Sequence, residues 1–193
     1  MDMAFDAIDE LSDDALIVLY GNGDRAAAAA LTARLTPLVF SLAMRMLNDR
    51  AEAEDLTQEA MLRLWRMAPD WEPGAAKVST WLYQVAANLA RDRLRKRRGL
   101  GLDEVPEPQD DTPGVEVAMI GKDRAEALHR ALDRLPERQK EAVVLRHIEG
   151  LSNPEIADVL KIGVEAVESL TSRGKRKLKE LLLGQKQELG LEE

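Results

Sequence analysis

Residues 152–183 read SNPEIADVLKIGVEAVESLTSRGKRKLKELLL, a pattern of two helices separated by a tight turn. Ser152 and Glu155 have the spacing of a capping box, in which each side chain accepts a backbone N–H of the other residue at a helix start. The turn 161–163 ends the first helix, and the second runs to about Leu183. The segment therefore predicts a helix-turn-helix motif, with a plain helical hairpin as the alternative.

The second helix of this motif carries residues that could contact a nucleic acid. In helix-turn-helix proteins, the N-terminal part of the second helix enters the major groove. Five basic residues against one acidic residue follow between Arg173 and Glu180, and such a row suits contact with phosphates. The candidate contacts are Glu165, Glu168, Ser169, Ser172, Arg173, Lys175 and Arg176.

An acidic, proline-containing segment divides the chain. Between Gly99 and Gly121 there is no Lys or Arg, while six residues are acidic and three are Pro. Proline blocks regular helix, so the segment predicts an extended connector. We expect an all-α protein with two helical domains, residues 1–98 and 122–193, joined by a flexible acidic linker at residues 99–121.

The rest of the C-terminal half also has helical patterns. One helix is expected over about residues 117–134. Pro136 suits the first turn of the next helix, which should stop at Gly150. The sequence shows neither the alternation typical of strands nor an internal repeat.

The N-terminal half starts with two capped helices. Ser12 can cap a short helix, which Gly21 and Gly23 end. Asp24 can cap a long one that runs to about Leu47. We expect Pro37 to kink or break this helix, because proline removes a backbone hydrogen bond.

A third and a fourth helix follow. Asp49 and Glu52 have capping-box spacing, with Asp in the Ser/Thr position, and the helix they start runs to about Met67. Residues 68–77 contain two prolines and a glycine and predict a loop. The last helix of this half is expected over residues 79–98.

The helix at residues 79–98 has a buried stripe and a basic end. Six basic residues against one acidic residue lie between Arg91 and Arg98, which suits phosphate contact or, alternatively, a favourable charge at the end of the helix dipole. Aromatic residues just before it suit stacking with unpaired bases or, equally, core packing. The expected buried stripe is Leu82, Val85, Ala86 and Leu89; the other face has Gln84, Asn88, Arg91 and Arg95; the aromatics are Trp71, Trp81 and Tyr83.

The helix that begins after Asp49 has an acidic face. Asp55 and Glu59 are four residues apart, and their repulsion costs an isolated helix about 0.3 kcal/mol. If no basic residue of the chain offsets this repulsion, a basic partner outside the chain is suggested. The alternative is a face that only keeps the protein soluble. The expected buried stripe of the same helix is Ala53, Leu56, Ala60 and Leu64.

The composition narrows the classes of function. The 193 residues carry a formal net charge of -8, so any nucleic-acid binding depends on local charge. The absence of Cys excludes disulfides and thiolate zinc sites. The acidic N-terminus does not resemble a signal peptide, and no apolar run approaches membrane-span length, so we expect a cytoplasmic protein without membrane insertion. His129 and His147 lack metal-ligand spacing, and no catalytic motif is present. We therefore expect no enzymatic activity and no bound metal or cofactor.

Several sequence runs resemble the extracytoplasmic-function sigma factors of the sigma-70 family. DRAEAEDLTQEA at residues 49–60, LRLW at 62–65, STWLY at 79–83 and ANLARDRLR at 87–95 resemble the second conserved region of that family. LPERQ at 135–139, LR at 145–146, EGLS at 149–152 and EIA at 155–157 resemble the fourth. The resemblance covers the chain from about Leu11 to Leu183.

This resemblance implies a role for the first domain. The domain would dock on the clamp helices of the large subunit of core RNA polymerase through Asp55, Leu56, Gln58 and Glu59. It would also melt and read the −10 element of promoter DNA, with the loop 68–77 holding a flipped base. The implied −10 contacts are Trp71, Trp81, Gln84, Asn88, Arg91, Asp92, Arg95 and Lys96.

The resemblance also implies roles for the rest of the chain. The helix from Val164 would read the −35 element, and the linker would thread toward the active cleft and the RNA exit path of the polymerase. Such factors are usually held inactive by an anti-sigma factor. In this chain Gly163 takes the cap position, and Glu168 and Leu170 stand where Arg or Lys is common. Glu168 could accept a hydrogen bond from a cytosine N4 amine.

Three other classes of protein remain as alternatives. A helix-turn-helix regulator that is not a sigma factor explains the C-terminal half, but not the basic row at residues 88–98. An enzyme acting on nucleic acid would need a defined carboxylate cluster for metal ions. A decoy that traps the inhibitor of a sigma factor would not start RNA synthesis.

Overall fold

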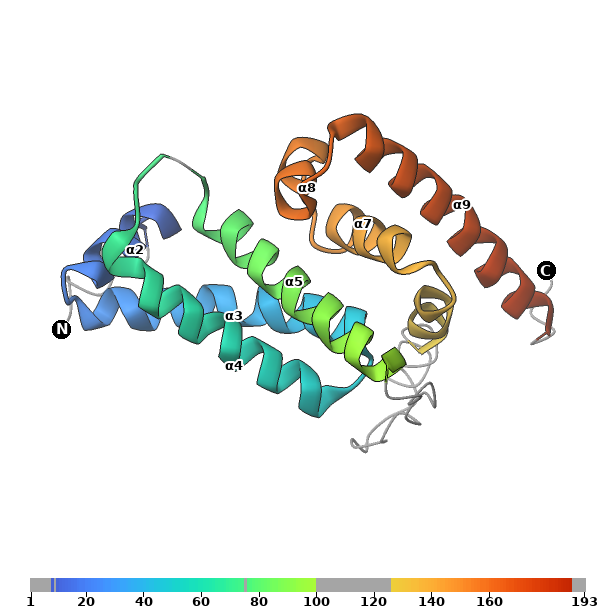
Figure 1. Ribbon diagram of the computed structural model, residues 1–193, viewed down its shortest axis with the longest axis horizontal. Helices are drawn as coiled ribbons and strands as arrows, with labels where there is room; N and C mark the ends of the chain where they lie inside the picture. The colour runs from blue at the N-terminus through green and yellow to red at the C-terminus, as the bar shows by residue number, and fades with distance from the viewer. Residues whose placement is uncertain (1–7, 9, 75, 100–125, 189–193) are drawn as a thin grey trace. The chain divides into compact units, whose positions relative to one another are not determined.

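Figure 1 shows the computed structural model of the chain, which describes residues 8, 10–74, 76–99 and 126–188. Every regular element in these ranges is a helix and none is a strand, which confirms the expected all-α class. The acidic linker lies almost entirely outside the described residues, as does the first part of the helix expected at 117–134, of which 126–133 are helical.

The chain divides into two compact units. The first is built on the four long or medium helices of the N-terminal half and one short 3₁₀ turn, and the second on α7, α9 and most of α8. The first-unit elements are α2 (Asp13–Gly21), α3 (Arg25–Leu47), α4 (Arg50–Met67), η1 (Ala68–Asp70) and α5 (Val78–Gly99); the later helices are α7 (Glu137–His147), α8 (Asn153–Leu160) and α9 (Val164–Glu188).

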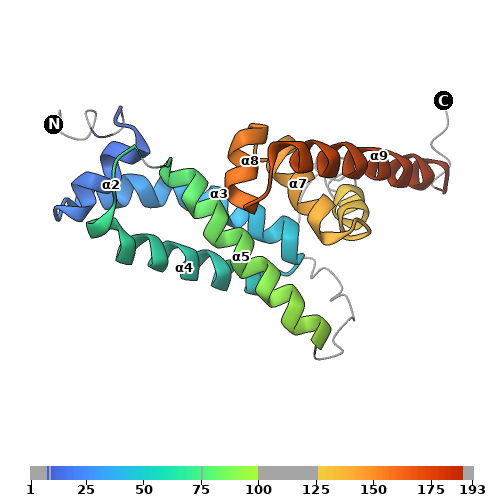
Figure 2. The ribbon, with the colours of Figure 1, turned by 45° about the horizontal axis from the view of Figure 1, so that its top comes forward.

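The core of the first unit forms around α3. This helix contacts α2, α4 and α5, and the views in Figures 1 and 2 agree that α5 lies along both α3 and α4. Leu35 of α3, Leu64 of α4 and Leu82 of α5 are at most 1% exposed. By length and composition alone α3 could cross a membrane, contrary to the expectation that no run reaches that length. Its apolar face is accounted for by eight buried residues that face the neighbouring helices.

The predicted N-caps of the first unit are confirmed, but the capping box at Asp49 is only half formed, because the Glu52 carboxylate contacts Arg97 and not the Asp49 N–H. Oγ of Ser12 accepts the backbone N–H of Ala15 at 3.2 Å, which starts α2. The carboxylate of Asp24 accepts two backbone N–H groups of α3, and that of Asp49 accepts the N–H of Glu52 at 2.9 Å. These side chains satisfy donors that have no partner within the helix.

Of the kink or break expected at Pro37, the break is wrong. Helix α3 continues through Pro37 as one element of 23 residues. Proline removes only one hydrogen bond of the helix, at a cost of about 3 kcal/mol. Leu35 and Val39 on either side are at most 1% exposed, so burial of both flanking turns holds the helix together.

The predicted helix-turn-helix elements are confirmed in α8 and α9. The capping box is complete: the carboxylate of Glu155 accepts the N–H of Ser152 at 2.9 Å, and Oγ of Ser152 accepts the N–H of Glu155. Helix α8 ends at Leu160, and Lys161 adopts a left-handed conformation with φ of 54°. Two ends differ from expectation, since α7 stops at His147 and α9 reaches Glu188.

A glycine sets how closely α7 and α9 approach. A Cβ atom at Gly174 would lie 2.6 Å from Cγ2 of Val143 and 3.1 Å from the carbonyl oxygen of Gln139. Such distances are too short for any side chain, so Gly174 allows the two helices to pack in direct contact. This packing fixes the exposed face of α9.

Candidate nucleic-acid interface

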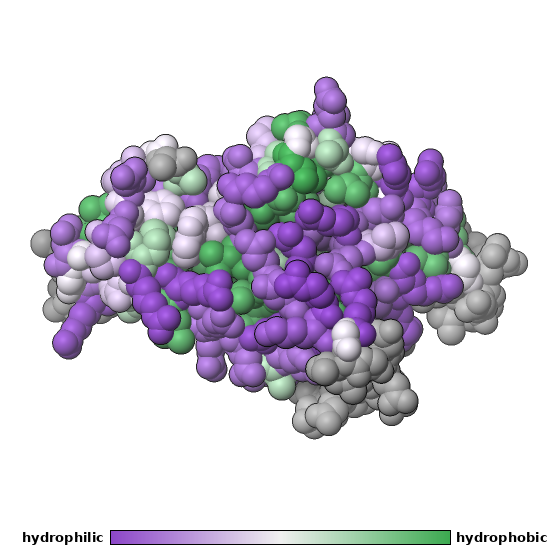
Figure 3. Space-filling model, in the orientation of Figure 1, coloured by the Kyte–Doolittle hydropathy of each residue, from purple (hydrophilic) through white to green (hydrophobic). Residues whose placement is uncertain are grey.

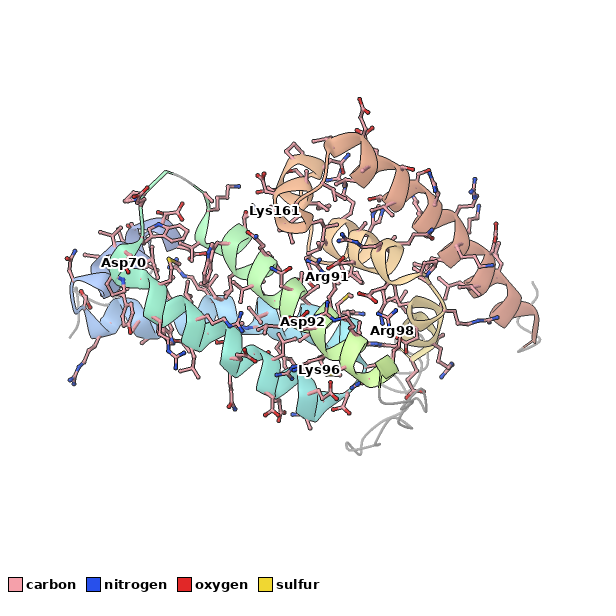
Figure 4. The ribbon with its side chains drawn as sticks, viewed as in Figure 1. Asp70, Arg91, Asp92, Lys96, Arg98 and Lys161 are labelled. Atoms are coloured by element: carbon pink, nitrogen blue, oxygen red, sulfur yellow. The ribbon has the colours of Figure 1, made fainter. Side chains whose placement is uncertain are left out.

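The basic end of α5 splits into an inward and an outward set of side chains. Arg93 and Arg97 turn toward α4, whereas the outward set contains the residues predicted to contact DNA, three of which are labelled in Figure 4. Asn88, Asp92, Arg95 and Lys96 are exposed, and Gln84 and Arg91 are half-buried.

Arg97 joins three helices. Its Nε lies 3.0 Å from Oε1 of Glu52, and its Nη2 lies 2.9 Å from Oε2 of the same carboxylate. Nη1 donates to the carbonyl oxygen of Leu47 at 3.0 Å, and Nη2 lies 3.7 Å from Oδ2 of Asp49. The guanidinium therefore holds the end of α5 against the end of α3 and the start of α4.

Arg93 makes a second link between α5 and α4. It donates to the carbonyl oxygen of Glu52, and its Nη2 lies 3.6 Å from Oε2 of Glu59. Arg93 and Arg97 are both only about one-fifth exposed. Of the six basic residues counted in the sequence, two are therefore engaged inside the unit.

The outward side chains are oriented by hydrogen bonds along the helix. Nη2 of Arg91 donates to Oδ1 of Asn88 at 2.5 Å, and Nη2 of Arg95 donates to Oδ1 of Asp92 at 2.9 Å. In Figure 3, hydrophilic residues cover the visible face over the last turns of α5. The outward set thus presents ordered guanidinium groups, which bind phosphates well.

The aromatic residues before this row have different environments. Trp71 and Trp81 are half-buried, and Nε1 of Trp71 is buried without a hydrogen-bond partner among the described residues. Tyr83 is 5% exposed and belongs to the core, which favours core packing of the two alternatives for this residue. The loop is tied down at its far end, where Oδ1 of Asp14 accepts the N–H of Val78 at 2.9 Å.

The acidic face of α4 differs from expectation in two respects. Asp55 and Gln58 are exposed and Glu59 is 42% exposed, but Leu56 is fully buried and can only support this face from beneath. The inference that the like-charge pair lacks an internal partner is wrong for Glu59. Its carboxylate pairs with Arg63 at 2.6 Å and with Arg93.

The sequence interpretation also missed an apolar residue on this face. Leu62 is 53% exposed and lies three, four and seven residues after Glu59, Gln58 and Asp55. Residues at these spacings share one face of a helix. Single exposed apolar residues are common on protein surfaces, so Leu62 belongs to this face without assigning it a partner.

The predicted recognition face of α9 lies opposite its core face. Val167 is fully buried, and Gly174 faces α7. Ser169 is half-buried, and Nδ2 of Asn153 donates to Oε1 of Glu168 at 3.5 Å. The other predicted contacts are all exposed, namely Glu165, Glu168, Ser172, Arg173, Lys175 and Arg176.

One histidine near this face has an altered acidity. Partial burial lowers the pKa of His147, and the charges of Lys175 and Arg146 lower it further. Protonated imidazole is thus disfavoured beside the basic helix. Within the described ranges, no group of three or more His, Asp or Glu side chains could hold a metal ion.

Comparison with known proteins supplies a family. Residues 31–99 match the family described as Sigma-70 region 2, and residues 125–178 match Sigma-70, region 4. The chain is 33% identical over 176 residues to the ECF RNA polymerase sigma factor SigE of Mycolicibacterium smegmatis, covering 86% of this chain and 66% of the relative. It is 30% identical over 171 residues to the ECF RNA polymerase sigma factor SigW of Bacillus subtilis, covering 83% of this chain and 91% of the relative.

A solved structure has the same fold. The sigma factor RpoE from Bartonella quintana, determined in complex with the anti-sigma factor NepR, superposes with a TM-score of 0.65. The identity is 23%, and the match covers 78% of this chain and 93% of that one.

Proposed function

Because the chain belongs to the extracytoplasmic-function sigma factors of the sigma-70 family, we propose that it binds core RNA polymerase and directs transcription initiation at specific promoters. One structural observation supports this proposal independently of the family assignment. The outward row of α5 is ordered by its own hydrogen bonds, while Arg93 and Arg97 anchor the helix from behind. Ordered cations beside half-buried aromatics suit a single strand of DNA.

The first unit would carry two contacts. Asp55, Gln58 and Glu59 would meet the clamp of the polymerase large subunit, with Leu56 packed beneath them. The −10 element would lie along α5 and the loop before it. Its proposed contacts are Trp71, Trp81, Gln84, Asn88, Arg91, Asp92, Arg95 and Lys96.

The second unit would read the −35 element. Helix α9 would enter the major groove with its N-terminal part, where Glu165 and Glu168 are exposed. The exposed basic residues of the following turns, Arg173, Lys175 and Arg176, would contact phosphates. The proposed domains are residues 1–98 and 122–193 with the linker at 99–121, and the family matches at 31–99 and 125–178 support this division.

An anti-sigma factor would control the protein. The relative from Bartonella quintana was determined with an anti-sigma factor bound, and the two chains share a fold. An inhibitor that covers the acidic face of α4 would exclude the polymerase. We place the protein in the cytoplasm, where core polymerase acts, and assign it no catalytic activity of its own.

Run-off transcription with core enzyme tests the function directly. Genomic fragments transcribed with and without the full-length protein should give discrete RNA ends only in its presence. A helix-turn-helix regulator that is not a sigma factor would give no start with core enzyme alone. The same result would be expected of an inhibitor-trapping decoy.

A further inference from the structure

Both ends of the loop 71–77 are attached to α2, which lies beside the loop in Figures 1 and 2. At the near end, η1 packs so closely against the last turn of α2 that a Cβ atom at Gly21 would lie 2.8 Å from the carbonyl oxygen of Ala68. At the far end, Oδ1 of Asp14 accepts the backbone N–H of Val78 at 2.9 Å. The loop is therefore held at both ends by a single helix of nine residues.

The two points of attachment share one face of α2. Asp14 and Gly21 are seven residues apart, which is close to two full turns of an α-helix. This step advances about 10.5 Å along the helix axis. Because the geometry of an α-helix fixes that distance, α2 sets how far apart the end of η1 and the start of α5 lie.

Asp14 completes the start of α5 from outside that helix. The first N–H groups of a helix have no partner within it. Val78 is the first residue of α5, and its N–H finds an acceptor 64 residues earlier in the chain. A carboxylate at this place also suits the positive end of the helix dipole. Removal of the Asp14 side chain should therefore loosen the start of α5 from α2.

Helix α2 is itself attached to the two long helices beside it. Nη1 of Arg34 on α3 donates to the carbonyl oxygen of Leu11 at 2.6 Å and to Oδ1 of Asp13 at 3.2 Å. The rings of Tyr20 on α2 and Trp65 on α4 have their centroids 4.7 Å apart. Helices α3 and α4 thus fix the position of α2, and α2 in turn fixes the two ends of the loop.

The two tryptophans proposed to contact the −10 element lie at opposite ends of this loop. Trp71 follows η1 directly, and its backbone N–H donates to the carbonyl oxygen of Ala68 at 3.2 Å. Trp81 lies at the end of the first turn of α5, where its backbone N–H donates to the carbonyl oxygen of Lys77 at 3.1 Å. Their separation depends on the spacing that α2 sets, although α2 contains none of the proposed DNA contacts.

Resting on the proposed function, we propose that α2 is a brace for base selection at the −10 element, with Asp14 as its positioning residue. Without the contact to Val78, Trp71 and Trp81 would move relative to each other, and a base beside them would lose its fixed surroundings. The outward set on α5 would keep its phosphate contacts, because hydrogen bonds within α5 orient it. Loss of the brace would therefore lower base preference more than overall affinity for DNA.

The first test uses the free full-length protein and follows amide hydrogen exchange at Val78 by nuclear magnetic resonance. In Asp14→Ala the exchange should accelerate about tenfold, the factor expected for loss of a hydrogen bond to a charged group. Asp14→Asn should keep the slow exchange, since its amide oxygen can still accept the N–H. Equal exchange in wild type and Asp14→Ala would overturn the inference.

Asp13→Ala is the matched control. Asp13 precedes Asp14 in the first turn of α2, but its carboxylate pairs with Arg34 at 3.2 Å and not with α5. This variant should leave the exchange at Val78 unchanged. Circular dichroism melts establish that each variant is folded.

The second test measures base preference in the holoenzyme. Fragments of a promoter mapped by run-off transcription, with its −35 element fixed and its −10 element randomised, are transcribed with core enzyme, and the RNA from each fragment is counted by sequencing. Asp14→Ala should reduce the preference at one −10 position about fivefold, the lower end of what one base pair contributes. Asp14→Asn and Asp13→Ala should keep the wild-type preference. Gly21→Ala, which forces η1 away from α2, should affect the same position as Asp14→Ala.

Failure of the brace is distinct from failure of the proposed function. Discrete RNA starts with an unchanged −10 preference in Asp14→Ala would overturn the brace and leave the proposed function intact. An equal loss of preference in Asp13→Ala would also overturn it, because the effect would then come from the stability of α2 and not from the loop. The absence of any start with wild-type protein would overturn both.

Discussion

Arg97 at the end of α5 and Glu52 at the start of α4 face each other with two nitrogen–oxygen pairs, 2.9 and 3.0 Å apart. The two residues are 45 positions apart in the sequence, and their contact fixes the direction in which the basic end of α5 points.

Replacing Arg97 should lower the stability of the first unit. Arg97→Met removes one hydrogen bond to the Glu52 carboxylate and one to the Leu47 carbonyl oxygen at a site that is about one-fifth exposed, so we expect a loss of about 1–2 kcal/mol in the free energy of unfolding. Arg95→Met is the control, since that side chain is 78% exposed and its loss should change stability by less than about 0.5 kcal/mol. Urea unfolding followed by circular dichroism measures both. Equal effects would show that the Arg97 contacts do not hold α5.

Gly174 and Gly184 provide a matched pair within α9. Gly174→Ala places a methyl group 2.6 Å from Val143, and the resulting overpacking should cost about 1–3 kcal/mol and weaken −35 binding. Gly184→Ala meets nothing within 4 Å and should raise helix stability by about 0.5–1 kcal/mol. Thermal unfolding and gel-shift titrations with duplex promoter DNA provide the readouts. A neutral Gly174→Ala would contradict the close contact of α7 and α9.

Glu168 should contribute to base preference. Its exposed carboxylate lies on the second turn of α9 and can accept a hydrogen bond from a cytosine N4 amine. Binding selection from randomised −35 duplexes with Glu168→Ala should relax the preference at one position, by about 1–3 kcal/mol of discrimination. An unchanged consensus would exclude this contact.

The stability of the second unit should fall in mild acid through His147. Burial, Lys175 and Arg146 lower its pKa below 6.5 in the folded state, so the unfolded chain binds the proton more readily. The stabilisation of the folded state by neutral His147, relative to the protonated form, is complete above pH 6.5. It is lost as the pH falls from there through the folded-state pKa. His147→Gln should remove this part of the pH dependence of the urea midpoint. An identical pH profile for the variant would mean that His147 does not titrate with folding.

The sequence predicted those parts of the fold that depend on local chemistry. Ser12, Asp24, Asp49 and Ser152 each accept a backbone N–H at a helix start, and the spacing of the side chains was enough to locate them. The break expected at Pro37 does not occur, because burial of the residues on both sides offsets the free-energy cost of proline in a helix. The sequence pattern of one helix does not reveal that burial.

The candidate site was less predictable because orientation depends on the neighbouring helix. A count of charges along the sequence cannot separate Arg93 and Arg97 from Arg95. The three residues differ only in the folded protein, where Arg93 and Arg97 contact α4 and Arg95 pairs on its own helix. Tyr83 and Leu56 belong to the core, whereas Leu62 is exposed. For Leu62 a signal was present, since its spacing from Asp55 and Glu59 puts it on their face.

The most direct measurement of the central claim is promoter opening by the reconstituted holoenzyme, followed by permanganate reactivity of unpaired thymines. Wild-type protein with core enzyme should expose thymines just upstream of the mapped start, and so should Arg25→Glu, which changes an exposed residue at the far end of α3. Arg91→Glu combined with Arg95→Glu should abolish this reactivity while core binding is retained. If the double variant opens the promoter as well as wild type, α5 does not grip the melted strand and the assignment is contradicted.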